Sequence, residues 1–216
     1  MLTSPSQMKN LINLFHQGAR LTYNKGEFII RPGETPSGLY YVSSGLVKAY
    51  DITKYGDENL LIIRRRGEIL GLTWAITGQD RGIIYAALAP TTVFFITREQ
   101  FTSFIHNNPE TALPLVDMLV DMYRLHSERI LTLEYRTVRE RLVAFLLNTA
   151  DRFGKQEKDG ILIDVPLRQQ DIASSISATR ETTGRELAAL ERQDLLRHQQ
   201  SRILLTNVEK IRHYLR

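Results

Sequence analysis

QQDIASSISATRETTGRELAAL, residues 169–190, contains two short helical patterns with a break between them. The first pattern covers residues 171–176, whose apolar side chains can face inward together with Leu167. The break is Ser177-Ala-Thr179, and its last residue is a favourable N-cap for a second helix that ends near Gln193. The spacing therefore predicts two helices joined by a tight turn.

The second of these helices has two chemically different faces. Arginine can donate two hydrogen bonds to guanine, and a carboxylate can accept one from the cytosine amino group. Glycine costs a helix up to about 1 kcal/mol, but it lets the backbone approach a partner closely. The pattern favours a surface that contacts DNA bases, and an exposed i, i+4 charge pattern is the alternative. The inward face carries Thr183, Leu187 and Leu190, and the outward face carries Glu181, Gly184, Arg185 and Ala188, with Arg180 at its edge.

The flanking sequence indicates a larger module. An amphipathic helical pattern begins at Val138, and it is followed by the polar loop Lys155–Gly160 and a strand-like alternation at Ile161–Val165. After the second helix, Leu195–Leu205 is a hairpin candidate. Together these elements predict a winged helix-turn-helix domain over residues 138–216.

The N-terminal part has a different rhythm. From about Leu21 to Ile96, short apolar runs alternate with glycines, as in many short strands joined by tight turns. We therefore expect an antiparallel β-roll in a domain covering residues 1–108. The expected strands include Glu27–Ile30, Leu39–Val42, Leu46–Tyr50, Asn59–Ile63 and Val93–Ile96.

A long amphipathic helix is expected between the two, over residues 109–137. Its apolar residues recur at spacings of three and four, and such a stripe can pair with a second copy of the helix. The alternative is that the stripe packs on its own roll. We favour a dimer because the helix is longer than a small domain. The predicted dimer seam is Leu119, Met122, Tyr123, His126, Ile130 and Leu133.

Composition restricts the function classes. The 216 residues carry a formal charge of +4, which suits an anionic partner, and they include no cysteine, which excludes disulfides and cysteine-ligated iron–sulfur clusters. The N-terminus lacks the pattern of a signal peptide and no apolar run could span a bilayer, so we expect a cytoplasmic protein with no membrane contact.

Motifs of catalysis are missing from the sequence. Its five histidines show no metal-ligand spacing, and we find no P-loop, nucleophile elbow or dinucleotide fingerprint. A cupin-like enzyme would need histidines within residues 21–96, which contain none. We therefore predict that the protein is not an enzyme and has no metal site; a scaffold protein is the remaining rival to a DNA-binding protein.

The sequence resembles the cyclic-AMP receptor protein/Fnr superfamily of bacterial transcription regulators along nearly its whole length. Thr179–Arg185, TRETTGR, is similar to the family's recognition helix SRETVGR. Further similar segments are Gly45–Lys48, Arg141–Leu147 and Leu190–Leu196. The resemblance implies an α+β fold with a cyclic-nucleotide-binding-like jelly roll, a dimerisation helix and a winged helix-turn-helix.

The resemblance also implies a function and its residues. A homodimer would bind a pseudo-palindromic operator with TGTGA-like half-sites, and it would contact RNA polymerase if it activates transcription. The loop Lys155–Gly160 lies where activating family members touch the polymerase. Base contacts are implied for Arg180, Glu181 and Arg185, and phosphate contacts for Gln170, Thr179 and Thr182. One departure is Ser177, which stands where the family usually has glycine; a left-handed backbone there would cost serine on the order of 1 kcal/mol.

The effector is less clear from the resemblance. Family members that bind cyclic AMP hold its ribose with a glutamate and its phosphate with arginine and serine. Here Gly71 and Arg81 match, but Leu72 replaces the glutamate and Gly82 the serine, so a ribose hydroxyl would lose its partner at about 1–3 kcal/mol. Cyclic AMP is therefore disfavoured.

Other anions stay open as effectors. Arg81, Thr73 and the amides near Gly71 could hold a small anion, such as the 2-oxoglutarate used by related nitrogen regulators, or Arg81 could be a turn residue in a roll that binds nothing. His126 and Ser127 lie where the family's partner subunit reaches the ligand, although His126 could equally be a packed histidine of the seam. The sequence gives neither the effector, nor the target genes, nor the sign of regulation.

Overall fold

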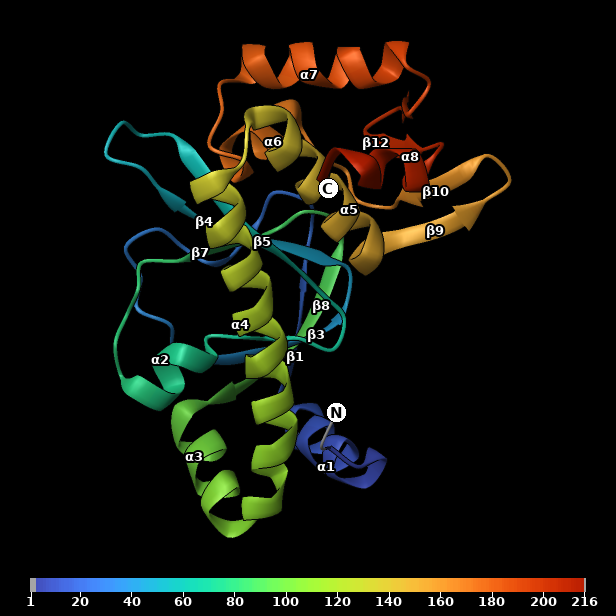
Figure 1. Cartoon of the computed structure of the whole chain (residues 1–216). Helices are drawn as coiled ribbons and strands as arrows, with labels where there is room; N and C mark the ends of the chain where they lie inside the picture. The colour runs from blue at the N-terminus through green and yellow to red at the C-terminus, as the bar shows by residue number, and fades with distance from the viewer. Residues whose placement is uncertain (1–2, 216) are drawn as a thin grey trace. The chain divides into compact units, whose positions relative to one another are not determined.

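The computed structural model describes residues 3–215, which form two compact units (Figure 1). One unit comprises residues 3–51 and 61–125, and the other comprises residues 52–60 and 126–215. Residues 52–60 include the turn of a β-hairpin whose two strands lie mainly in the first unit, so the tip of this hairpin groups with the C-terminal part of the chain. The fold is the α+β type that the sequence predicts.

The first unit is an antiparallel roll of two four-stranded sheets. The strand orders are β1-β8-β3-β6 and β2-β7-β4-β5, and the pairs β1–β8, β8–β3, β3–β6, β2–β7 and β7–β4 are antiparallel. The strands predicted from the glycine-punctuated runs are present. The elements of this part of the chain are α1 (Pro5–His16), β1 (Ala19–Tyr23), β2 (Phe28–Ile30), β3 (Gly38–Ser44), β4 (Leu46–Ile52), β5 (Glu58–Arg65), β6 (Ile69–Leu70), α2 (Leu72–Thr77), β7 (Ile84–Ala87), β8 (Thr91–Thr97), α3 (Arg98–Asn107), a 3-10 turn (Pro109–Thr111) and α4 (Ala112–Tyr135).

Apolar side chains from the strands and from α1 fill the roll. Leu39 and Ile96 are almost fully buried, and they belong to one cluster with Leu11 and Phe15 of α1. Helix α1 begins at a capping box in which the Gln7 amide donates to the Ser4 hydroxyl at 3.3 Å. The apolar face of α1 thus covers one end of the roll.

Gly71 fixes the entry into α2. Its φ is +80°, and a side chain at this position would bring a Cβ to 2.8 Å from the Gly38 carbonyl oxygen. Both the left-handed backbone and the close approach require glycine. The chain therefore turns sharply from β6 into α2, and Leu72 enters the core as the first residue of the helix.

The C-terminal unit is a winged helix-turn-helix. Its sheet has the strand order β11-β12-β10-β9 and packs against the helices of the unit. Five apolar side chains of its core are at most 2% exposed: Leu142, Leu146, Ile163, Ile172 and Leu190. None of the helices within residues 3–215 combines the length and apolar character needed to cross a membrane. The elements are α5 (Val138–Phe153), β9 (Gly154–Glu157), β10 (Gly160–Ile163), α6 (Gln169–Ser175), α7 (Arg180–Arg192), β11 (Leu196–Gln199), β12 (Arg202–Leu205), α8 (Val208–Arg212) and a 3-10 turn (His213–Leu215).

One sequence prediction in this unit was wrong. Lys155–Gly160 was expected to be a polar loop, but residues 154–157 form strand β9, which pairs with β10 in the register Leu162 to Lys155. All four residues of β9 are exposed, so the strand has no alternation of apolar and polar side chains. Backbone pairing with β10, and not side-chain burial, forms this strand.

Candidate nucleic-acid interface and pocket of the roll

The turn between α6 and α7 has the geometry that the sequence suggested. Thr179 caps α7, because its hydroxyl accepts a hydrogen bond from the Thr182 amide at 3.1 Å. Ser177 has a φ of 49°, which is the left-handed conformation that glycine adopts most easily. The Ser177 carbonyl accepts a hydrogen bond from Nη1 of Arg141 at 3.4 Å. Arg141 of α5 thus stabilises the turn, although the backbone of Ser177 is strained.

Helix α7 presents its charged residues to solvent. Thr183, Leu187 and Leu190 are buried, and Arg180, Glu181 and Arg185 are exposed on the helix that Figure 1 draws in orange. Nη2 of Arg185 donates to the Thr182 hydroxyl at 3.2 Å. That bond limits the directions in which the Arg185 side chain points. The three residues predicted to contact bases therefore share one accessible surface.

The residues predicted to contact phosphates lie at one open groove. Gln170, Thr179 and Thr182 line it together with Arg180 and Asp57. Hydroxyl and amide side chains are common phosphate ligands in DNA-binding proteins. The groove is continuous with the α6–α7 turn, where a helix-turn-helix protein meets the DNA backbone.

Gly184 serves the packing of α6 on α7. A Cβ at this position would collide with the amide of Gln169, whose Nε2 donates to the Arg180 carbonyl at 3.0 Å. The sequence argument assigned this glycine to close approach of a partner outside the protein. The nearest group in the structure is Gln169, a residue of α6, so the glycine also has an intramolecular role.

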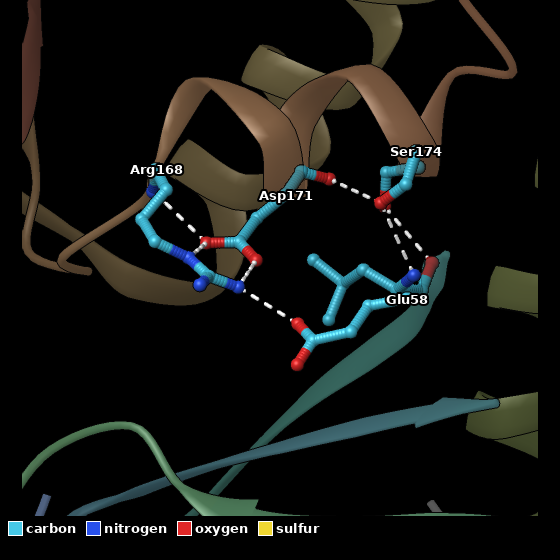
Figure 2. A network of polar contacts seen from close by, with 6 residues as sticks. Glu58, Arg168, Asp171 and Ser174 are labelled. Carbon is cyan, nitrogen blue, oxygen red and sulfur yellow. Dashed lines mark hydrogen bonds and ion pairs between the residues drawn. The ribbon is translucent and has the colours of Figure 1, made fainter. Parts of the chain in front are cut away.

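Helix α6 is fixed at its N-terminus by an arginine network (Figure 2). Nε and Nη2 of Arg168 donate to the two carboxylate oxygens of Asp171 at 2.9 and 2.7 Å, and Nη2 also donates to Glu58 at 2.8 Å. Asp171 is buried and also accepts from the Arg168 amide at 3.0 Å. These hydrogen bonds, chiefly those to Asp171, raise the pKa of the Arg168 guanidinium.

The same helix exchanges hydrogen bonds with the tip of the β4–β5 hairpin. The Leu60 amide donates to the Ser174 hydroxyl at 3.2 Å, and the Ser175 hydroxyl donates to the Leu60 carbonyl at 3.2 Å. Figure 2 shows Glu58 and Ser174 on facing elements of this contact. The hairpin tip and α6 therefore form one hydrogen-bonded body, which sequence analysis missed because the partners are more than a hundred residues apart.

A pocket in the roll gathers four of the seven predicted effector residues. Gly71, Leu72, Thr73 and Arg81 line a cavity of about 40 Å³. Leu72 is 4% exposed and packs in the core, so the position of the family's glutamate is filled by an apolar side chain. Among the described residues, Gly82, His126 and Ser127 are not part of the cavity lining.

Among the residues of this pocket that sequence analysis missed is Arg64 on β5. It lies in the run Arg64-Arg-Arg66, which resembles an ordinary solvated charge cluster. In the structure Arg64 is 9% exposed and lines the cavity. No local pattern distinguishes it from its neighbours, so its burial emerges only from the packed roll.

Helix α4 carries an exposed apolar stripe over 24 residues. Of the predicted seam, Tyr123 and Ile130 are 74% and 62% exposed, and Leu119 is also exposed. Met122, His126 and Leu133 are half-buried. Such a stripe of large apolar side chains indicates an interaction surface. Further exposed members are Val116, Val120, Leu131 and Tyr135.

Comparison with known proteins identifies both units. Residues 20–108 match the cyclic nucleotide-binding domain, and residues 140–214 match the Crp-like helix-turn-helix domain. The chain is 30% identical to the global nitrogen regulator of Nostoc sp. over 88% of its own length and 90% of the relative's. The chain belongs to the Crp/Fnr family of transcription regulators. The predictions of the family, and of a regulator instead of an enzyme, are thereby confirmed.

Other Crp/Fnr relatives show how widely the fold is used. A CRP-like cAMP-activated global transcriptional regulator of Mycobacterium tuberculosis is 26% identical, with 88% of this chain and 84% of the relative covered. The c-di-GMP responsive regulator CLP of Xanthomonas campestris has the same fold, with a TM-score of 0.79, 20% identity and coverage of 94% of this chain and 100% of that one. These two names state different effectors, so family membership alone does not identify a ligand.

Proposed function

We propose that this Crp/Fnr regulator acts as a homodimer that reads a pseudo-palindromic operator with TGTGA-like half-sites. The observation that carries the proposal is the shared exposure of Arg180, Glu181 and Arg185 on one face of α7, opposite the buried face of the helix. Arginine pairs with guanine and glutamate with cytosine in the major groove. Gln170, Thr179 and Thr182, at the groove beside the turn, would bind phosphates.

The apolar stripe on α4 supports the homodimer. Two helices that pair along Leu119, Tyr123 and Ile130 would bury side chains that are otherwise in water. A two-fold dimer places its recognition helices in successive major grooves, about 34–36 Å apart. Met122, His126 and Leu133 would flank this seam. The regulator would act in the cytoplasm on double-stranded DNA and, where it activates, together with RNA polymerase.

The pocket of the roll would bind a small anionic effector without a metal or prosthetic group. Arg81 and Thr73 offer donors to an anion, while the buried Leu72 offers nothing to a ribose hydroxyl. Gly71, Gly82, His126 and Ser127 complete the set of residues proposed for the effector. Binding would favour the DNA-competent state through its higher affinity for that state. Calorimetric titration with cyclic AMP and with 2-oxoglutarate separates these ligands, and an effector-independent regulator would bind neither.

Operator binding tests the base contacts. In fluorescence anisotropy on a two-half-site duplex, Arg180→Ala and Arg185→Ala should each lose about 1–3 kcal/mol at one base pair and accept other bases there. The matched control is Arg192→Ala, at the exposed C-terminal end of the same helix, which should keep the sequence preference. Uniform weakening on every DNA sequence would contradict base recognition and leave phosphate binding alone.

A further inference from the structure

Gln169, the first residue of α6, forms a hydrogen bond with the recognition helix α7. Its Nε2 donates to the main-chain carbonyl of Arg180, the first residue of α7, at 3.0 Å. The two residues are 11 positions apart in the chain and lie on the two sides of the α6–α7 turn. The bond therefore joins the helix that carries the proposed base contacts directly to the helix beside it.

The side-chain amide of Gln169 also lies against the backbone of α7 at Gly184. A Cβ at Gly184 would stand 2.1 Å from Nε2 of Gln169, which is far shorter than any van der Waals contact. Only glycine leaves room for the amide at this place. Gly184 follows Arg180 by four residues, so the two are neighbours on one face of the helix. The amide thus occupies a space beside α7 that the sequence of α7 keeps free.

The backbone of Gln169 has a well-defined position at the start of α6. The residue before it, Arg168, donates to the buried carboxylate of Asp171 through Nε and Nη2 at 2.9 and 2.7 Å (Figure 2). The Arg168 amide donates to the same carboxylate at 3.0 Å. These bonds close the first turn of α6 around Gln169. A side chain on such a restrained turn can in turn restrain the group that it binds on α7.

We propose that Gln169, placed against Gly184, is a positioning residue for base recognition: its hydrogen bond fixes the backbone from which Arg180 reaches a base. The role rests on the proposed function, because it acts through one of the proposed base contacts. A bidentate contact between arginine and guanine requires a geometry held to within about 10–20°. Arg180 is the first residue of its helix, and helix ends fray more easily than helix interiors. The bond from α6 restrains this end.

Arg185 depends less on this restraint. It lies inside α7, two residues before the buried Leu187, and its Nη2 donates to the Thr182 hydroxyl at 3.2 Å. Loss of the Gln169 amide should therefore disturb the base pair read by Arg180 more than the base pair read by Arg185. A residue that merely stabilised the domain would affect the two base pairs alike.

Replacing Gln169 by methionine tests the proposal. Methionine has a similar length and no charge, but it lacks the amide donor. The full chain is titrated with duplexes that carry each base at every position of one half-site, and Arg180→Ala and Arg185→Ala identify the base pair that each arginine reads. In Gln169→Met, the preference at the Arg180 base pair should fall about three- to tenfold, the effect of one hydrogen bond, while the preference at the Arg185 base pair stays within about twofold of wild type.

Gln156→Met is the matched control. Gln156 is an exposed residue of β9 whose Nε2 also donates to a main-chain carbonyl, that of Gly160, at 3.3 Å. The substitution therefore removes the same kind of hydrogen bond from the same unit without touching α7. All base preferences of Gln156→Met should equal those of wild type.

Gly184→Ala tests the same contact from the side of α7. The new Cβ would displace the Gln169 amide, whereas alanine is the better helix former, so α7 itself should not melt. The preference at the Arg180 base pair should again fall. In a Gln169→Ala background the amide is already absent, and Gly184→Ala should cause no further loss. Losses that simply add would mean that the alanine obstructs DNA by itself, which contradicts the proposed contact.

Three results with Gln169→Met would overturn the proposal. They are an unchanged preference at the Arg180 base pair, equal losses at the Arg180 and Arg185 base pairs, and equal weakening on every duplex, which would indicate a direct phosphate contact. If Gln169→Met does not fold, Gly184→Ala decides in its place. Uniform weakening by Arg180→Ala itself would instead contradict the proposed function, whereas a normal Arg180 preference in Gln169→Met contradicts only the role of Gln169.

Discussion

The winged module and the roll each depend on an arginine beside a carboxylate, and the two arginines are satisfied very differently. Arg168 in the module is 61% exposed as a side chain, yet it holds Asp171 with two hydrogen bonds and Glu58 with a third. Arg64 in the roll is nearly buried, yet its Nε has no partner in the described part of the chain. Arg64, the more buried arginine, therefore has the less complete set of hydrogen bonds, although an unpaired donor costs more free energy in a buried site.

This contrast separates an arginine whose exposed guanidinium is anchored to a buried carboxylate from one that is buried with a donor unpaired. Evolution toward stability alone would pair a buried donor or replace it by an apolar side chain, because an unpaired buried polar group costs about 1–3 kcal/mol. Within residues 3–215, Nε of Arg141, the arginine that bonds the Ser177 carbonyl, is buried and unpaired in the same way. Arg168 therefore belongs to the scaffold of the helix-turn-helix, and the incomplete pairing of Arg64 predicts that its removal costs the roll little stability.

The largest difference in stability between the two sites is expected when Arg168 and Arg64 are each replaced by leucine. Arg168→Leu leaves the buried carboxylate of Asp171 without its cation, and we expect the local stability of α6 to fall by about 2 kcal/mol, a value reduced because Arg168 is partly exposed. Arg64→Leu should cost less than about 1 kcal/mol or stabilise the roll, since Glu68 keeps Arg65 as a partner. Hydrogen exchange of amides in α6 and in β5 measures both changes.

The double variant Arg168→Leu with Asp171→Leu is the control for this pair. It removes the stranded carboxylate and should recover part of the stability lost in Arg168→Leu. An equal loss in Arg168→Leu and Arg64→Leu would remove the distinction between the two sites, and Arg64 would then be a structural residue like Arg168.

Sequence analysis was strong for the helix-turn-helix and for the strands of the roll, and weak for the wall of the pocket and for strand β9, for a physical reason. The cap at Thr179 and the buried stripe ending in Leu190 follow from interactions between residues close in the chain, and the structure contains both. The left-handed backbone of Ser177 was considered only through the family resemblance, and the structure contains it too. The burial of Arg64 depends on strands paired across long stretches of sequence, which no local pattern records. Strand β9 escaped prediction because its side chains are all exposed.

A smaller effect should come from the turn of the helix-turn-helix. Ser177→Gly relieves the left-handed strain of about 1–2 kcal/mol and loses part of that gain to the greater freedom of glycine in the unfolded chain, so we expect stabilisation by about 1 kcal/mol or less. Urea denaturation followed by circular dichroism measures the change. The control is Ser174→Gly in α6, which should destabilise. A loss of stability in Ser177→Gly would mean that the serine makes a compensating contact.

The smallest effect is expected at the outer edge of the Arg168 network. Glu58 is 35% exposed and meets the 61% exposed Arg168 at 2.8 Å, so its ion pair is partly solvated and contributes about 0.2–1 kcal/mol. Glu58→Gln should therefore weaken protection of the α6 amides only slightly, and the difference should vanish at about 1 M salt, where charges are screened within about 3 Å. Arg168→Leu should keep its larger effect in the same salt, because its cost arises from a carboxylate buried away from the solvent ions. If salt abolished both effects alike, the Asp171 contact would be as solvent-screened as that of Glu58, and the module would lose the buried anchor that distinguishes it from the roll.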